Sequence, residues 1–306
     1  MRRAFGDTGI DGAITEFTAG WFNVTYGIRL GDGRNVVLKI APPPGVPVLG
    51  YEANIMSTEV ATMRLLRNHP VIPVPTIHFY DPSREICDAD YFFMERVPGT
   101  PLDAIKQQLD AVQLASIETQ TGKILRAING FRGAYFGYPG NPELQGVTWP
   151  ETFSSLFESL LQDAEAVGVK LAPCSDDLRL IVSRNLDALT EVNAPCLVHW
   201  DLWETNIVID GGSVAGIIDF ERALWAEPLM EAQFRALSDE GVTDVMRSYG
   251  KKQFTRSEYR RCDLYSLYLG LIMLVESVYR AYDTEDVTKM GSELIAGAVQ
   301  RLSLEE

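Results

Sequence analysis

The first third of the chain alternates between apolar and polar positions in short runs that glycine and proline interrupt. Residues 14–40 contain three such runs, and Asp32-Gly33 between two of them is a turn signal typical of hairpins. The stretches "TIHFYD" (76–81) and "YFFMERV" (91–97) are rich in aromatic and β-branched residues, which favour strands. The pattern therefore predicts an antiparallel sheet near the start of the chain.

A change to helical spacing separates this sheet from the rest of the sequence. Residues 51–68 have apolar side chains at intervals that predict a helix, and nearly everything beyond the breaker Pro98-Gly99-Thr100-Pro101 has helical spacing. One short β-like stretch, residues 196–219, interrupts the helices. We therefore expect two lobes, residues 1–97 and 98–306.

Composition and charge narrow the class of protein. The chain has 306 residues, of which 46% are hydrophobic, and this suits two lobes with substantial cores. The net charge of −15 argues against a nucleic-acid partner and is compatible with a cationic small molecule, although it also serves solubility alone. We find neither an apolar run of about 18 residues nor a signal-peptide pattern, so we expect a cytoplasmic protein without a membrane partner.

The stretch "HWDLWETN" (199–206) gathers polar and aromatic side chains between two apolar, strand-like runs. Asp201 lies in this loop, Asn206 begins the next strand, and Asp219 ends the strand after it. A two-residue Gly211-Gly212 turn between the strands brings their outer ends together. Phosphoryl transfer requires a carboxylate that accepts a hydroxyl proton and oxygen ligands for Mg²⁺. The spacing therefore predicts such a site, whereas each residue taken singly would also suit a turn or a strand end.

The pattern H-x-D-x-x-x-x-N at 199–206, followed by I-I-D-F at 217–220, resembles the aminoglycoside phosphotransferase family of kinase-like enzymes. This resemblance implies an α+β, bilobal, protein-kinase-like fold with a small β-rich N-terminal lobe and a larger, mostly helical C-terminal lobe. It implies Asp201 as the catalytic base, and Asn206 and Asp219 as ligands of Mg²⁺. The family most often has Gly where Trp200 stands, so this residue is a departure.

The same resemblance directs attention to the predicted N-terminal lobe. A kinase-like site needs a cation on the nucleotide phosphates that is held by a helix carboxylate, and we assign Lys39 and Glu59 to these roles, with Glu52 as the competing helix partner. The resemblance also implies that the strand ending near residue 97 borders the adenine base. The nucleotide-binding residues expected there and in the first hairpin are Gly20, Met94, Glu95 and Val97, of which Gly20 is also explained by a simple β-turn.

The phosphate acceptor is expected near the catalytic loop and the segment after Asp219. Acidic and aromatic side chains gather there, and they suit a hydroxylated, cationic molecule. They would equally suit a solvated helix face or the protein core. The candidate acceptor-binding residues are Trp200, Trp203, Glu204, Glu221, Trp225 and Glu231.

We therefore expect a small-molecule kinase that uses ATP or GTP with Mg²⁺ to phosphorylate a hydroxyl of an acceptor such as an aminoglycoside-like antibiotic. One alternative is a metabolic kinase of an amino alcohol or sugar, similar to choline, homoserine or fructosamine kinases. Another is a catalytically silent kinase-like binding module. A protein kinase is disfavoured because no D-F-G or A-P-E segment with an activation loop follows Asp219.

Overall fold

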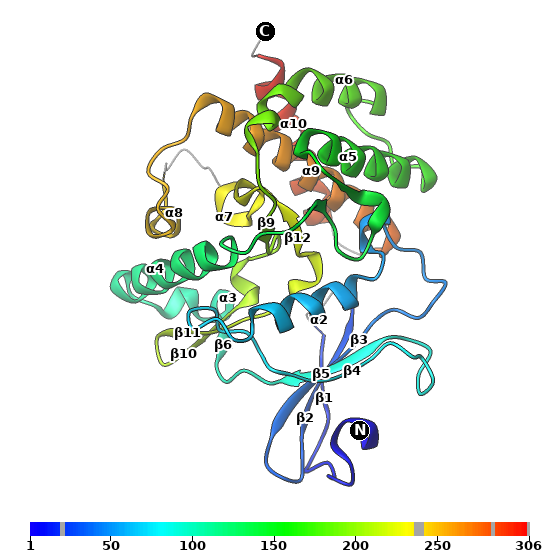
Figure 1. Ribbon diagram of the computed structural model, residues 1–306, viewed down its shortest axis with the longest axis vertical. Coiled ribbons are helices and arrows are strands. Elements are labelled where there is room, and N and C mark those ends of the chain that lie inside the picture. Colours follow the sequence, from blue (N-terminus) through cyan, green and yellow to red (C-terminus); the bar gives the residue numbers. More distant parts are fainter. Residues whose placement is uncertain (19–21, 236–241, 283–284, 305–306) are drawn as a thin grey trace. The chain divides into compact units, whose positions relative to one another are not determined.

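The protein, seen in a computed structural model, is described over residues 1–18, 22–235, 242–282 and 285–304 (Figure 1). It divides into two compact units, each of which is discontinuous in sequence. Unit 1 consists of Met1–Pro47, Ile55–Ile117 and Trp203–Glu221, and unit 2 consists of Val48–Asn54, Glu118–Leu202 and Arg222–Glu306. The break expected after Val97 thus falls inside unit 1.

Unit 1 is built on the predicted antiparallel sheet. Its strands are β1 (Thr15–Phe17), β2 (Val24–Arg29), β3 (Asn35–Ile40), β4 (Ile77–Asp81) and β5 (Tyr91–Glu95). They pair in the order β1-β2-β3-β5-β4, and every pair is antiparallel. Helix α2 (Ile55–Leu66) packs against this sheet with contacts to β4, and the short α1 (Arg2–Phe5) precedes it in the chain (Figure 1). Apolar side chains that alternate along the strands form the core cluster Ile28, Leu30, Val36, Tyr91 and Phe93.

A second, smaller sheet in unit 1 contains the predicted hairpin. Its strands are β6 (Thr100–Pro101), β10 (Ile207–Asp210) and β11 (Ser213–Ile217), in the order β11-β10-β6, and α3 (Leu102–Ile105) follows β6. The turn between β10 and β11 has positive φ at Gly211 (55°) and Gly212 (80°), which the tight hairpin turn requires and glycine permits.

Unit 2 is mainly helical. Its helices are α5 (Trp149–Ala166), α6 (Ser175–Asn185), α7 (Ala232–Arg235), α8 (Asp244–Tyr249), α9 (Arg256–Tyr279) and α10 (Glu285–Ser303), together with the second half of α4 (Ala111–Ile128). The strands β7 (Phe136–Gly137), β8 (Gln145–Gly146), β9 (Cys196–Val198) and β12 (Leu224–Ala226) form a sheet in the order β8-β7-β12-β9. A β-rich unit followed by a mainly helical one is the α+β organisation that the sequence predicts.

Helix α9 is the central helix of unit 2. It crosses α10 closely, because a Cβ atom added at Gly270 would lie 2.7 Å from the carbonyl oxygen of Gly291. By length and composition α9 could also span a membrane, but 72% of its most apolar window is buried inside the protein. This degree of burial is what the core helix of a folded unit shows.

The segment 48–54 belongs to unit 2, although it links β3 to α2. The Tyr51 hydroxyl donates a hydrogen bond of 2.6 Å to Glu276 of α9, and the Gly50 N–H donates one of 2.9 Å to Asp163 of α5. Glu52, which is buried, forms an ion pair with Arg280. The chain is therefore anchored in unit 2 immediately before the helix that bears Glu59.

Candidate functional site

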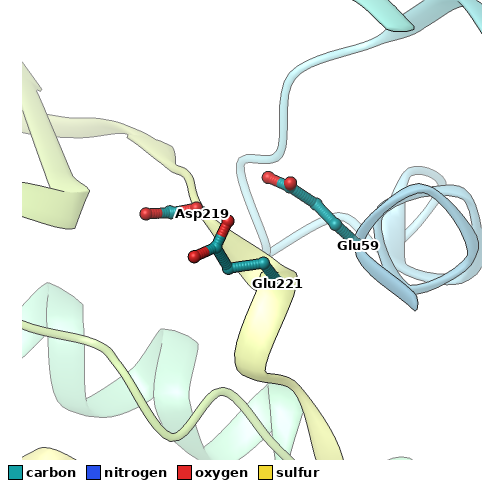
Figure 2. A group of neighbouring side chains, drawn as sticks. All are labelled: Glu59, Asp219 and Glu221. Atoms are coloured by element: carbon teal, nitrogen blue, oxygen red, sulfur yellow. The ribbon is translucent and has the colours of Figure 1, made fainter. Parts of the chain in front are cut away.

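The side chain of Lys39 lies at the centre of a charged cluster in unit 1. Its Nζ atom lies 2.8 Å from Oε2 of Glu59, 2.5 Å from Oδ1 of Asp219 and 3.1 Å from Oε2 of Glu221. Figure 2 shows the carboxylate of Glu59 turned toward those of Asp219 and Glu221, which follow β11. The expected pair of Lys39 and Glu59 is thus present. Glu52, the competing partner, binds Arg280 in unit 2.

Burial and charge act against one another in this cluster. Burial alone would lower the pKa of Lys39, but the charges of Asp219, Glu221 and Glu59 outweigh it and raise that pKa well above its ordinary value. Burial raises the pKa of Glu59 to about 7. The charge of Lys39 lowers this pKa but offsets the effect of burial only in part, and the negative charge of Asp219 raises it further. The ammonium therefore stays charged, and the acidic groups around it exceed it in number.

The hairpin positions both residues expected to bind metal. Asn206 ends a short 3-10 helix that leads into β10, and its carbonyl oxygen accepts a hydrogen bond of 3.1 Å from the N–H of Ile218. Asp219 comes directly afterwards with a φ of 67°, in the left-handed region. The Asn206 end of the hairpin and the Asp219 end are therefore held together by backbone contacts, as the Gly-Gly turn predicts.

The cluster is suited to a divalent cation. Carboxylate oxygens of Glu59, Asp219 and Glu221 lie within 4.8 Å of one another, and hard cations such as Mg²⁺ prefer oxygen ligands and retain several waters. Oε1 of Glu59 is buried and has no hydrogen-bond partner of acceptable geometry within the described ranges, although the backbone N–H of Phe220 lies close enough to the carboxylate to lower its pKa. Leaving a buried acceptor unsatisfied costs about 1–3 kcal/mol, and a hydrated cation would supply the missing donor. The residues present thus fit Mg²⁺.

The predicted catalytic base, Asp201, belongs to unit 2 and follows an unusual turn. Trp200 has a φ of 70°, a conformation that favours glycine, and this explains why the resembled family most often has Gly at this position. Two backbone donors hold the turn, because the N–H groups of His199 and Trp200 donate to Glu231 at 2.9 and 3.1 Å. The side chain of Asn129 also donates to Glu231, at 2.9 Å.

These contacts change the interpretation of two candidate acceptor residues. Glu231 is fully buried, and its carboxylate, whose pKa burial raises, accepts hydrogen bonds from the loop instead of lining a rim. Trp200 is 1% exposed, and its ring lies 5.8 Å from that of Tyr268. Both side chains are therefore part of the core of unit 2, and we do not retain them as acceptor contacts.

The other candidate acceptor residues have different surroundings. Trp203 is 38% exposed, whereas Glu221 is buried in the cluster with Lys39. Glu204 forms an ion pair of 2.5 Å with Lys106 in unit 1. Trp225 lies on β12 and is half-buried. Trp203 and Glu204 thus remain the candidates with the most accessible side chains.

The strand expected to border the nucleotide base ends as β5. Met94 is buried, and Glu95 is the last residue of the strand, with an exposed side chain. Val97 follows and packs against β11, because a Cβ atom added at Gly216 would lie 2.8 Å from its Cγ1. Gly20 lies outside the described residues. The bordering role of this strand remains a prediction.

One site residue, Asn23, is absent from the candidates that the sequence provides. Its side-chain nitrogen donates a hydrogen bond of 2.6 Å to Oε2 of Glu221, from 198 positions earlier in the chain. A single Asn before a strand is an ordinary turn residue in sequence. Only the fold could bring it to the cluster.

Comparison with known proteins identifies a family and a similar fold. A profile described as "Phosphotransferase enzyme family" matches residues 13–264. Two curated relatives, both subtelomeric hrmA-associated cluster proteins from strains of Aspergillus fumigatus, are 31% identical over 125 residues, which is 40% of this chain. The match spans only 24% of the length of those relatives.

Solved structures of similar fold span nearly the whole chain. A structure described as a fructosamine-3-kinase from Thermobifida fusca is 20% identical with a TM-score of 0.69, covering 99% of this chain and 96% of that one. The streptomycin–ATP complex of APH(2")-IIa is 16% identical with a TM-score of 0.65, over 98% and 95%. A mutant of aminoglycoside phosphotransferase APH(4)-Ia with AMP-PNP and hygromycin B is 18% identical with a TM-score of 0.65, over 98% and 96%. At these identities the likeness shows the kinase-like fold alone.

Proposed function

The chain belongs to the phosphotransferase enzyme family, and from this premise we propose that it transfers the γ-phosphoryl group of a nucleoside triphosphate to a hydroxyl group of a small, cationic molecule. The observation that carries the proposal is the position of Lys39, whose ammonium is held by Glu59 and lies 2.5 Å from Asp219. The cation proposed to bind phosphate and the carboxylate proposed to bind metal are thus adjacent in unit 1.

Each residue has a defined task in the proposed reaction. Asp201 accepts the proton of the acceptor hydroxyl, whose oxygen forms a bond to the γ-phosphorus as the bond from that phosphorus to the β–γ bridging oxygen breaks. Lys39 donates hydrogen bonds to phosphate oxygens, and Asn206 and Asp219 would hold Mg²⁺. When bound, the cation neutralises charge on the phosphates. The products are a nucleoside diphosphate and a phosphate ester.

The acceptor class is inferred from charge. The protein carries a net charge of −15, and a cationic acceptor would be attracted to it. Neighbours of similar fold include complexes with streptomycin and hygromycin B, which supports an aminoglycoside-like acceptor. The likeness to the structure described as a fructosamine-3-kinase supports a second candidate, a metabolic kinase of an amino sugar or amino alcohol. A silent binding module is disfavoured because Lys39, Asp201, Asn206 and Asp219 are all present.

A nucleotide-consumption assay tests the proposal. The full chain is incubated with ATP or GTP, Mg²⁺ and one of a panel of acceptors: aminoglycosides, choline, homoserine, fructosamines and uncharged sugars. We expect consumption that requires both Mg²⁺ and one cationic acceptor class, with the phosphate ester detected by mass spectrometry. If calorimetry detects no binding of either nucleotide with Mg²⁺, the kinase proposal is wrong.

A further inference from the structure

The contact between Asn23 and Glu221 links the segment before β2 to the charged cluster of unit 1. Asn23 is only 7% exposed, and its Nδ2 atom donates to Oε2 of Glu221 at 2.6 Å. Among the described residues its Oδ1 atom is buried and has no hydrogen-bond partner. The Nδ2 atom of the Asn23 amide thus orients Glu221, while its Oδ1 atom is an acceptor without a donor among the described residues.

The same Oε2 atom of Glu221 also accepts a hydrogen bond from Lys39, at 3.1 Å. An ammonium group has three N–H donors, and the three carboxylates around Lys39 match that number. Lys39 must therefore release a carboxylate before it can donate to a phosphate oxygen. The contact with Glu221 is the longest of the three and is the one we expect to be released first.

Releasing this contact has an electrostatic consequence. Once Lys39 turns toward a triphosphate, Glu221, which is buried, and Asp219, which is partly exposed, would lose their compensating charge, and for the buried Glu221 this is costly. A divalent cation would replace that charge. Its bound waters would also supply donors to Oδ1 of Asn23 and Oε1 of Glu59, which are two of the buried acceptors that lack partners in the described part of the chain.

We propose that Glu221, oriented by Asn23, is a positioning residue that retains Lys39 in the carboxylate cluster and thereby makes nucleotide binding depend on a divalent cation. The proposal rests on the proposed function and deepens it, because it assigns a regulatory task to a residue next to the metal ligand. Glu221 would thus set how strongly the bound cation increases the affinity for the nucleotide. By thermodynamic linkage, the nucleotide would increase the affinity for the cation by the same factor.

The test measures this coupling without turnover. Calorimetry gives the Kd of a non-hydrolysable ATP analogue with and without Mg²⁺, and the ratio of the two is the coupling factor. We expect Glu221→Gln to lower this factor about tenfold, mainly because the metal-free analogue binds more tightly once a competing negative charge is removed. Asn23→Ala should change the factor in the same direction by about threefold, since Glu221 keeps its charge but loses its orientation.

Two further variants make the result decisive. Asp210→Asn removes one exposed negative charge from the same unit and should leave the coupling factor unchanged. Asp219→Asn should abolish the effect of Mg²⁺. If Glu221→Gln and Asn23→Ala weaken binding equally with and without Mg²⁺, both residues are merely structural and the inference is overturned. If Asp219→Asn leaves the coupling factor unchanged, the proposed metal site itself fails.

Discussion

The ammonium nitrogen of Lys39 lies 2.5 Å from the carboxylate of Asp219, so the residue proposed for the phosphates and the one proposed for the metal are partners in one ion pair. Replacing Lys39 by Met leaves buried carboxylates without this cation. Breaking a buried ion pair from one side costs about 3–5 kcal/mol, and we expect a loss of this order in the free energy of unfolding measured with urea. The double variant Lys39→Met/Glu59→Gln should lose less free energy of unfolding than Lys39→Met alone. If Lys39→Met were as stable as the wild type, this explanation would be wrong.

Asp201→Asn tests the proposed base. An amide of the same shape cannot accept the hydroxyl proton, and general-base catalysis contributes roughly 10²–10⁴-fold to rate. We expect kcat to fall by about this factor, while the Kd for the nucleotide measured by calorimetry stays within about twofold, because the residue is not assigned to nucleotide binding. A variant that retains the wild-type kcat would remove Asp201 from the mechanism.

Glu231→Gln tests how the turn before Asp201 is held. One of the two oxygens that accept from the N–H groups of His199 and Trp200 becomes an amide nitrogen, which leaves a buried donor unsatisfied. The expected cost is about 1–3 kcal/mol in the free energy of unfolding. The matched control is Glu204→Gln, whose exposed pair with Lys106 should cost about 1 kcal/mol at most. Similar losses for the two variants would argue against the bracing role.

Trp200→Gly sets backbone strain against packing. Glycine would relieve about 1–2 kcal/mol of left-handed strain, but removing a buried Trp side chain costs about 3–5 kcal/mol. Packing should dominate, and we expect a net loss of about 1–4 kcal/mol in chemical denaturation. The control Trp203→Ala, at a 38% exposed side chain, should lose less than about 1 kcal/mol. A stabilised Trp200→Gly variant would mean that strain outweighs packing here.

Asp81 predicts a pH dependence of stability in unit 1. Hydrogen bonds from Ser83, followed by those from Tyr91 and Arg3, lower the pKa of this carboxyl to about 2. Because the folded-state pKa lies below the unfolded one, the stabilisation is fully present above about pH 5 and is lost as the pH falls toward 2.

The measurement compares wild type with Asp81→Asn in urea from pH 7 to pH 3. The wild type should be more stable at pH 7, and the difference should narrow below about pH 4. A difference that stays constant over the whole range would show that the charge of Asp81 does not contribute.

The sequence predicts well those features that depend on short stretches of chain. The meander and the Gly211-Gly212 hairpin follow from alternation and turn chemistry, because glycine permits the turn and strand pairing fixes the register. The pair of Lys39 with Glu59 follows instead from what a kinase-like site requires. The family pattern at 199–206 adds the candidate residues Asp201 and Asn206, which lie within one short motif.

Other features depend on contacts that no local pattern encodes. Asn23 and Glu221 are 198 positions apart, and no local pattern pairs one with the other. Glu231 looks like one more acidic residue on a helix, yet it is fully buried beneath the turn at Trp200. The expected break after Val97 separates strands from helices, whereas the units are defined by contacts, which place the β10–β11 hairpin with the early strands.

The location of segment 48–54 in unit 2 has a consequence for the order of events on the ribosome. Unit 1 cannot be completed until Trp203–Glu221 has been synthesised, and the partners of Tyr51 and Glu52 on and beside α9, Glu276 and Arg280, emerge later still. An early segment must therefore wait, unpaired, for most of the chain to be translated. Neither unit can be expressed as a single uninterrupted fragment, so the protein is expected to fold largely after its synthesis is complete.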